Sequence, residues 1–204
     1  MHVKFQQIPE WLFSKKVTSK VMSKFWYSNN IKSIPERLFE KNVNATNFNF
    51  LFNECEGITS IPEKLFENNV KAISFEFVFF RCSELKSIPE NLFKNNINVT
   101  DFSGSFWGCK KITNIPEKLF ENNVKVTKFN STFFACEGLT NIPENLFKNN
   151  INVIDLKNLF YLCTGITNIP NNIIEFSKRV KNRGGDIEDM FKYTSVANYE
   201  KLLR

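Results

Sequence analysis

Histidine is almost absent from this 204-residue sequence: His2 is the only one, and aspartate occurs only four times. A single histidine at the second position of the chain argues strongly against a Ser-His-Asp triad, a Cys-His pair or a histidine-ligated metal site. The sequence also lacks a glycine-rich phosphate loop and a nucleophile elbow. We therefore expect a protein that is not an enzyme and that needs no cofactor, no metal and no small-molecule substrate.

Long apolar runs are missing as well, although 42% of the residues are hydrophobic and 24% are charged. No stretch is long enough to cross a membrane as a helix. The first residues, MHVKFQQIPEWLF, contain neither the apolar region of a signal peptide nor a lipobox cysteine. These features favour a cytoplasmic protein that does not bind a membrane.

Proline is scarce, with seven in the chain, but its placement is regular. Each proline follows an isoleucine, and the prolines are Pro9, Pro35, Pro62, Pro89, Pro116, Pro143 and Pro170. The first gap is 26 residues and the next five are 27 residues, which identifies a tandem repeat. A unit of this size cannot bury its own apolar side, so neighbouring coils must bury one another's.

Aligned on the prolines, the repeats form apolar columns, which predict ladders of stacked side chains in a shared core. Leu-Phe pairs recur at Leu12-Phe13, Leu38-Phe39, Leu65-Phe66, Leu92-Phe93, Leu119-Phe120 and Leu146-Phe147, with Ile173-Ile174 in the last copy. One aromatic column is Phe48, Phe75, Phe102, Phe129 and Leu156, and a second is Phe25, Phe52, Phe79, Phe106, Phe133 and Phe160. The aliphatic columns are Val43, Val70, Ile97, Val124 and Ile151, and Ile58, Leu85, Ile112, Leu139 and Ile166.

Cysteine also forms a column, at Cys55, Cys82, Cys109, Cys136 and Cys163. Metal sites need close spacing such as C-x-x-C, whereas these residues are 27 apart. Stacked thiols could come within disulfide distance, but the odd number and the parallel directions of the side chains argue against it. We expect small, buried and reduced thiols.

Within one repeat, the residue types predict short regular elements. Residues 126–129 and 139–142 have the β-branched and aromatic composition of strands. Pro116 followed by Glu117 predicts the start of a short helix over residues 116–120. An asparagine column is expected to end each helix with a positive φ, at Asn42, Asn69, Asn96, Asn123 and Asn150.

The pattern V-x-x-F-x-x-x-F-x-x-C-x-x-[IL]-x-x-I-P resembles the repeat of the BspA-type leucine-rich repeat family. It is carried by Val99, Phe102, Phe106, Cys109 and Ile112, and the resemblance extends over residues 34–168. It implies a binding scaffold. Members of that family are often surface or secreted bacterial proteins that contact host proteins. The repeat of this chain is slightly longer than theirs.

Together, the pattern and the resemblance predict an α/β fold. We expect a leucine-rich-repeat solenoid of about seven 27-residue coils, with parallel sheet on one side, short helices on the other and degenerate end caps. Residues 1–204 would form one domain. It divides into an N-terminal capping coil (1–33), five regular repeats (34–168) and a degenerate last repeat with a C-terminal cap (169–204), where Phe191 is displaced by an insertion near Gly184-Gly185.

The column after the second phenylalanine column varies in size and polarity, which is typical of a surface. It holds Trp26, Asn53, Phe80, Trp107, Phe134 and Tyr161, and the residues three positions earlier include Phe50 and Phe77. In an extended segment, neighbours of a core residue point outward, so these aromatics would form an exposed stripe that binds a protein partner. Two alternatives stay open: a tight turn that leaves the rings half-buried, and a platform on which bases stack.

The net charge of +6 is concentrated at the chain start, where residues 1–33 carry +5. The basic patch consists of Lys15, Lys16, Lys20, Lys24 and Lys32. It would either bind an acidic partner or phosphate, or form a solvated cap that keeps the open end from stacking on another molecule.

Three functions follow from these patterns. The first is a non-catalytic, monomeric scaffold, an intracellular inhibitor or adaptor that grips a partner protein along the aromatic stripe. One form of it would be a mobile-element-encoded blocker of a host defence nucleoprotein complex. The second, implied by the family resemblance, is a surface or secreted adhesin-like module. The third is nucleic-acid binding through the lysine-rich first coil.

Overall fold

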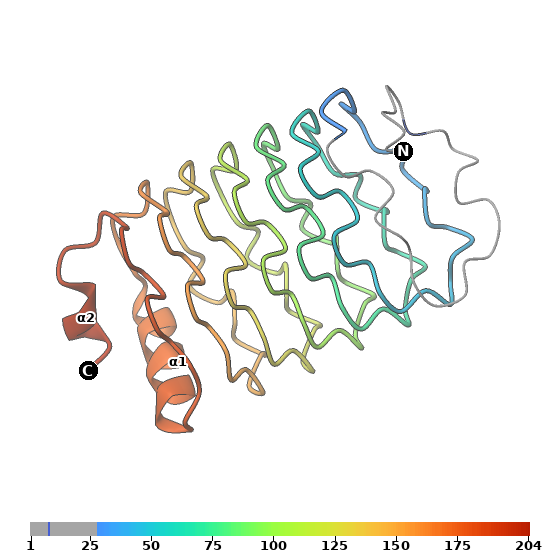
Figure 1. Cartoon of the computed structure of the whole chain (residues 1–204). Coiled ribbons are helices and arrows are strands. Elements are labelled where there is room, and N and C mark those ends of the chain that lie inside the picture. The colour runs from blue at the N-terminus through green and yellow to red at the C-terminus, as the bar shows by residue number, and fades with distance from the viewer. Residues whose placement is uncertain (1–7, 9–27) are drawn as a thin grey trace.

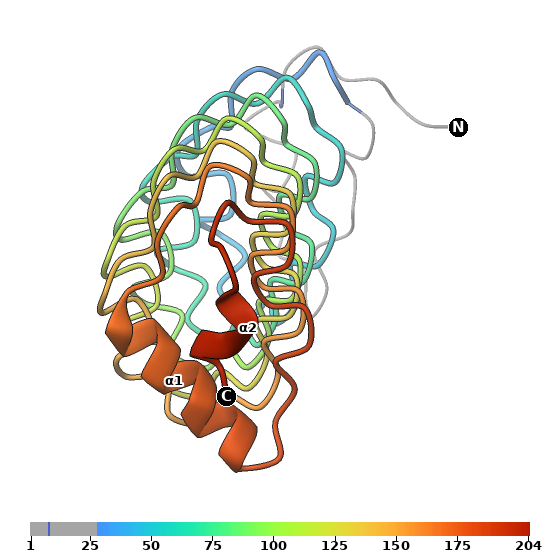
Figure 2. The same ribbon diagram turned by 90° about the vertical axis from the view of Figure 1, so that its left-hand side faces the viewer.

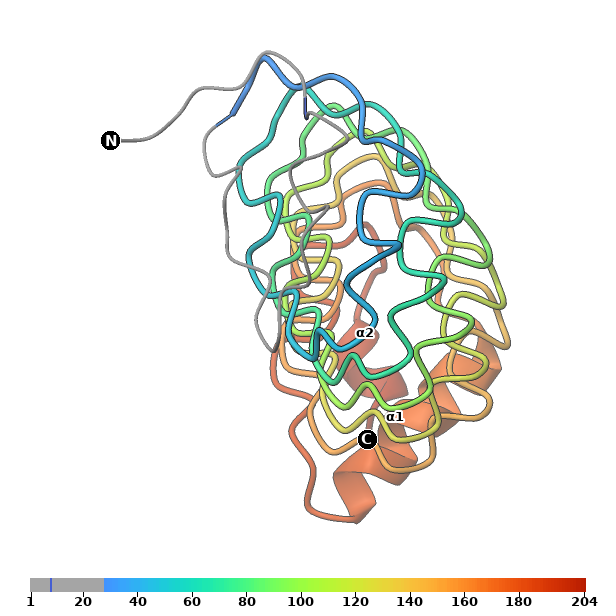
Figure 3. The same cartoon turned by 90° about the vertical axis from the view of Figure 1, so that its right-hand side faces the viewer.

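The computed structural model describes Ile8 and residues 28–204. Over this range the chain winds into coils that lie side by side along one axis, and the two helices lie at the C-terminal end (Figure 1). Isolated parallel bridges join six consecutive coils, each bridge pairing one residue with its equivalent in the next coil. The bridged residues are Asn47, Ser74, Asp101, Lys128, Asp155 and Asp186. Each repeat therefore forms one coil of the stack. Seen from the N-terminal side, the outlines of successive coils are similar and are displaced steadily from one another along the stack (Figure 3).

The predicted α/β fold with a parallel sheet and repeated short helices is wrong. In residues 28–204, no strand extends beyond a single bridged residue. The helices of the same range are α1 (Asn171–Asn182) and α2 (Tyr199–Leu202), both outside the regular repeats. Most repeat residues instead form turns.

A pair of left-handed residues in each coil explains why no strand forms. Positive φ occurs at two positions four residues apart, for example at Phe77 (51°) and Arg81 (54°). The chain therefore curls instead of running extended. The equivalent residues are Phe50, Glu54, Gly104, Gly108, Ser131, Ala135, Asn158, Leu162, Asp189 and Tyr193. Residues 126–129 and 139–142 are accordingly not strands, apart from the bridge at Lys128.

The curled segment still satisfies its backbone groups, because successive N–H groups alternate between two directions. The N–H groups of Phe75 and Phe77 donate to the next coil, to the carbonyls of Asp101 (3.1 Å) and Ser103 (2.8 Å). The N–H of Val78 donates within its own coil, to the carbonyl of Phe75 at 3.2 Å. The coils are thus hydrogen-bonded to one another without the dihedral angles of a sheet.

The segments predicted as helices are series of separate turns. Leu92, Lys94 and Asn96 each donate their N–H to the carbonyl three residues earlier, at 3.1–3.2 Å. Only alternate residues do so, and segments this short cannot offset the cost of helix nucleation. The asparagine column is not where φ becomes positive either, so its predicted role as a left-handed cap is wrong.

The asparagine column instead ties the coils together through buried amides. Asn96 Nδ2 donates to two carbonyls of the preceding coil, those of Phe66 (3.1 Å) and Asn69 (2.9 Å). Asn69, Asn123 and Asn150 repeat this pair of hydrogen bonds. Each amide therefore satisfies two main-chain acceptors that lie inside the stack, where water cannot reach them.

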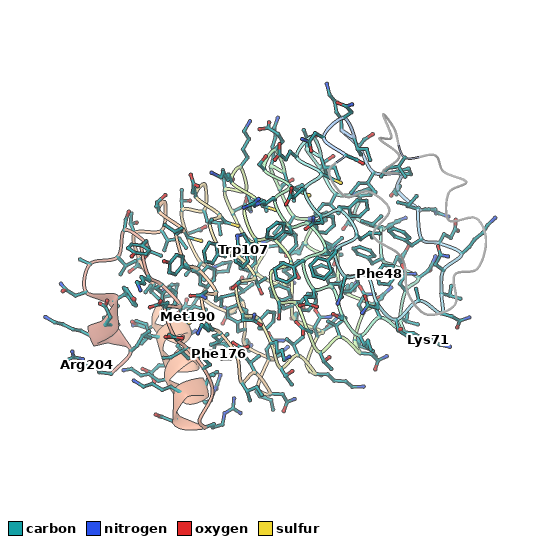
Figure 4. The ribbon with its side chains drawn as sticks, viewed as in Figure 1. Phe48, Lys71, Trp107, Phe176, Met190 and Arg204 are labelled. Atoms are coloured by element: carbon teal, nitrogen blue, oxygen red, sulfur yellow. The ribbon has the colours of Figure 1, made fainter. Side chains whose placement is uncertain are left out.

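The predicted ladders are buried in the core, with one column as an exception and with Ile174 of the last copy only half-buried. Both phenylalanine columns are fully buried from Phe48 and Phe52 onward, and rings of adjacent coils stack. Phe106, for example, lies 5.6 Å from Phe79 and 5.7 Å from Phe133, measured between ring centroids. These rows of rings run along the inside of the stack (Figure 4). Phe25 and the pair Leu12-Phe13 lie outside the described residues.

The exception is the aliphatic column that begins at Val43, which was expected in the core. Its members are 39–57% exposed: Val43, Val70, Ile97, Val124 and Ile151. The reason is a turn, because the N–H of Ala45 donates to the carbonyl of Asn42 and leaves Val43 at the outer corner. The residue two places later is buried in the core instead. These buried residues form a column made of Ala45, Ala72, Val99, Val126 and Val153.

The C-terminal end of the stack is covered by the two helices (Figure 2). The insertion that displaces the last copy is helix α1, whose Phe176 stacks on Phe147 at 5.1 Å. Phe191 then returns to the column and stacks on Phe160 at 5.7 Å. The short helix α2 follows, and Leu203 beside it is buried. Across residues 28–204, neither helix is long and apolar enough to cross a membrane.

Candidate binding surface

The aromatic stripe expected from the sequence lies on the curled segment of each coil. Phe80, Trp107, Phe134 and Tyr161 are half-buried, whereas Asn53 is only 8% exposed. The argument from strand alternation is wrong, because the positive φ values turn side chains that an extended chain would point outward. Of the two packing alternatives, the tight turn with half-buried rings is the one observed. Phe50 and Phe77 are half-buried too, and Trp26 lies outside the described residues.

The rings form one continuous row, which we call the aromatic strip: Phe50, Phe77, Phe80, Trp107, Phe134, Tyr161 and Tyr193. Trp107 stacks on Phe134 at 4.1 Å, and Phe134 stacks on Tyr161 at 4.7 Å. Phe80 meets Phe77 edge-on at 5.6 Å, so the row changes column there. Trp107 is labelled in Figure 4 near the middle of the stack. Mutual stacking fixes these rings and leaves part of each one accessible to a partner.

Gly104 makes room for the strip at the point where it changes column. A side chain at this position would collide with the Phe77 ring, since a Cβ atom would come within 2.2 Å of Phe77 Cε1. The backbone φ of 60° independently favours glycine. The absence of a side chain therefore lets Phe77 lie over the next coil, 6.1 Å from Trp107 between ring centroids.

Sequence reasoning missed two charged contacts on the strip. The Arg81 guanidinium lies 5.2 Å from the centre of the Phe80 ring, and its Nη1 is 3.5 Å from a carboxylate oxygen of Glu54. At the other end, Lys192 Nζ lies 5.6 Å from the centre of the Tyr193 ring and 3.0 Å from a carboxylate oxygen of Asp189.

Tyr193, which is 56% exposed, was also not predicted as part of the strip. Its column otherwise holds the non-aromatic residues Glu54, Arg81, Gly108, Ala135 and Leu162. The four-residue displacement of the last copy also hides the alignment. Counting two positions on from Phe191 would have placed Tyr193 beside the strip.

Carboxylates border the strip on the side of the parallel bridges. Burial raises the pKa of Glu76, and the nearby negative charge of Asp101 adds to this effect. Burial likewise raises the pKa of Asp155, with a further contribution from Asp186 in the next coil. The pKa of Tyr161 is raised by burial and by Tyr193. The charge of Lys128 lowers the pKa of both Glu76 and Asp155 and so offsets part of these upward shifts.

The basic patch is the second site expected from the sequence. Lys32 is exposed. Lys15, Lys16, Lys20 and Lys24 lie outside the described residues, so the patch as a whole stays a prediction.

The cysteine ladder lies in the core and not on a surface. The thiols of Cys82, Cys109, Cys136 and Cys163 are free and buried, and each donates to a phenylalanine carbonyl of the preceding coil at 2.9–3.3 Å. Burial raises the pKa of Cys163 to about 12, and the pKa values of the other three thiols are also raised by burial. Such thiols are hydrogen-bond donors without nucleophilic character.

These thiols should not react with an aromatic disulfide reagent at pH 8 while the chain is folded, because they are both inaccessible and protonated. In about 6 M guanidinium chloride, where the chain is unfolded, all the cysteines should react within the mixing time. Absorbance of the released chromophore measures both states. Rapid labelling of a thiol in the folded protein would contradict the burial of the ladder.

No group of three His, Cys, Asp or Glu side chains within the described part of the chain is arranged to hold a metal ion. The surface hollows between adjacent coils are shallow and polar, lined for example by Glu117, Lys118 and Asn145.

No family model matches this chain, and no curated protein shows significant sequence similarity to it. The resemblance to the BspA-type leucine-rich repeat family therefore stays a prediction.

Proposed function

We propose that this protein is a non-catalytic scaffold that binds a partner protein along the aromatic strip. The proposal rests mainly on one observation: seven aromatic rings from consecutive coils form a continuous, half-exposed row outside the core ladders. Tryptophan and tyrosine dominate the energetics of protein interfaces, because they present a large apolar area at little cost in conformational entropy.

The packing of the strip also supports a binding role. The core columns already supply the inter-coil stacking that the fold needs, since their rings are fully buried. The strip adds a second row whose rings remain partly in water, at a cost in exposed apolar surface that partner binding would offset. A monomeric, cytoplasmic inhibitor or adaptor is the form of this function that we favour.

Replacing both Trp107 and Phe134 with serine should abolish capture of the partner, because these are the most closely stacked rings of the strip. Partner capture is measured by affinity purification of the tagged protein from its native cells. Because the rings are half-buried, the double variant should also lose about 2–4 kcal/mol of unfolding free energy. Circular dichroism and urea unfolding will show whether it remains folded at the temperature of the assay.

The matched control replaces Ile97 and Val124 with serine. These residues belong to the same two coils as Trp107 and Phe134 but lie at exposed corners away from the strip, with 51% and 44% exposure. The control should keep both its stability and its partner. The proposal fails if the folded strip variant captures the same proteins as the unaltered chain, or if only the control loses them.

A further inference from the structure

The strip lies on a face whose charge is opposite to that of the whole protein. Its rings are carried by residues 47–57, 74–84, 101–111, 128–138, 155–165 and 186–196, which contain ten carboxylates and six cations. This face thus carries a net charge of −4, within a chain of net charge +6. None of these charged side chains is buried.

Each of the six cations on this face already has a carboxylate partner within the chain. Arg81 pairs with Glu54, Lys111 with Glu84, Lys110 with Glu137, Lys128 with Asp101, Lys157 with Glu188 and Lys192 with Asp189. Four carboxylates have no ion-pair partner among residues 28–204: Glu56, Glu76, Asp155 and Asp186. This face therefore has no unpaired cation among residues 28–204, and it carries an excess of negative charge.

Asp155 and Asp186 are the most informative of the four. They are equivalent residues of adjacent coils, joined by a parallel bridge. In each, Oδ1 accepts the N–H of the residue two places later, Lys157 at 3.1 Å and Glu188 at 2.8 Å. The pKa of Asp155 is raised by burial and by the charge of Asp186, whereas the Lys157 N–H and the charge of Lys128 lower it; the net shift is upward.

Carboxylates of this face act on the rings and on the cations beside them. Asp189 influences the ionisation of both Lys157 and Tyr161, and Asp186 also acts on Lys157. At the other end, the Glu54 carboxylate reaches the guanidinium that covers the Phe80 ring. A segment lying along the rings would pass beside the carboxylates of Glu54 and Asp189.

On the basis of the proposed function, we propose that the strip binds a basic polypeptide segment, whose lysine or arginine side chains pair with Asp155, Asp186, Glu56 and Glu76 while its apolar side chains pack on the rings. Charge complementarity selects this occupant. Nucleic acid is disfavoured on this face, because its phosphates would meet unpaired carboxylates and no unpaired cation.

The distribution of charge along this face also predicts where the cations of the bound basic segment should lie. The first and last of the six strip-bearing segments each carry −2, and the four between them sum to zero. With coils about 4.8 Å apart, the two acidic ends lie roughly 24 Å from one another. An extended chain covers that distance in about seven residues. The preferred ligand is therefore an apolar stretch of about that length with cations at both ends.

Two labelled synthetic peptides test the inference by fluorescence anisotropy. They share an apolar centre of about seven residues and differ only in carrying two lysines or two glutamates at each end. The full-length protein should bind the lysine peptide at least about tenfold more tightly than the glutamate peptide, and added salt should weaken this binding. The double variant D155N/D186N, which keeps both Oδ1 acceptors, should lose about tenfold in affinity for the lysine peptide.

The charge control is E90Q/E144Q, which neutralises two exposed carboxylates on the proline-side turns and should bind the lysine peptide unchanged. Equal binding of the two peptides, tighter binding of the glutamate peptide, or no binding of the lysine peptide up to about 1 mM would each overturn the inference. If the strip variant loses its cellular partner while the peptides show no charge preference, the proposed function stands and only the basic character of the ligand is wrong. If the strip variant keeps its partner, the proposed function itself fails.

Discussion

Replacing Phe106 with alanine is expected to lower the free energy of unfolding by about 3–5 kcal/mol. The Phe106 side chain is fully buried, and its ring is held between those of Phe79 and Phe133. It also lies 6.3 Å from Phe93 in the neighbouring column. Truncation therefore leaves a cavity that spans two coil junctions.

The size of the effect follows from the architecture. In a stack of repeats, each coil is stabilised only by its two neighbours, so weakening both junctions of one coil reduces the coupling between the halves of the molecule. Urea unfolding monitored by circular dichroism measures the change. The F106A curve should also broaden, because the two halves then unfold less cooperatively.

Phe134 provides the comparison, since it is a phenylalanine of the adjacent coil that lies on the strip and is half-buried. The F134A substitution should cost about 1–2 kcal/mol, because its ring already contacts water and leaves no closed cavity. Equal losses for F106A and F134A would contradict the assignment of one ring to the core and the other to the surface.

The second large effect is expected from replacing Asn96 with aspartate, which should lower the free energy of unfolding by about 3–5 kcal/mol at pH 7. Asn96 is fully buried, and its Nδ2 donates to the carbonyls of Phe66 and Asn69. An oxygen in place of Nδ2 would face two carbonyl oxygens without a proton to share. The introduced carboxyl group can avoid a buried charge only by remaining protonated.

This substitution should therefore make stability depend on pH in a defined direction. Burial beside two carbonyls raises the pKa of the introduced carboxyl group above the value of about 3.9 that it has in the unfolded chain. The unfolded state then releases the proton more readily, so the loss relative to the unaltered protein grows as the pH rises above about 4. Below that pH, the protonated group donates one hydrogen bond and the loss should shrink.

Asn95 is the matched control, because it precedes Asn96 and is exposed, with its Nδ2 3.0 Å from the carbonyl of Glu67. The N95D substitution should change stability by less than about 1 kcal/mol and add little pH dependence. Thermal unfolding of both variants between pH 3 and 7 will separate them. An N96D protein as stable at pH 7 as N95D would contradict the role of the buried amide ladder.

Which columns form the core was largely predictable from the sequence. The phenylalanine, leucine-phenylalanine and cysteine columns are buried, as expected from apolar residues that recur at one fixed period. The repeat period alone, however, could not distinguish apolar columns that lie in the core from apolar columns that lie at exposed corners. Val124 and Val126 are two places apart and equally apolar, yet the first is 44% exposed and the second is fully buried. The turn between Asn123 and Val126 decides this, and it depends on a hydrogen bond that no composition reveals.

The secondary structure was not predictable from local composition. Residues 126–129 have the β-branched and aromatic residues of a strand, and residues 116–120 begin like a helix, but neither forms the expected element. Stacking against two neighbouring coils supplies the backbone partners that a sheet or helix would otherwise provide, so local propensity has little influence. The asparagine column shows the same effect, since its amides bond to the preceding coil instead of capping their own.

By itself, the sequence determined the number of residues in each coil, through seven Ile-Pro pairs, and the identity of most core ladders, through residues that recur every 27 positions. Its single histidine, at position 2, also argued against the commonest catalytic sites. Only the tertiary structure decided that the coils are joined by turns and single bridges, and that the remaining aromatics form one half-exposed row with carboxylates beside it. The physical reason is that burial and charge pairing depend on contacts between coils. Residues 27 positions apart in the chain lie next to one another only after the stack has formed.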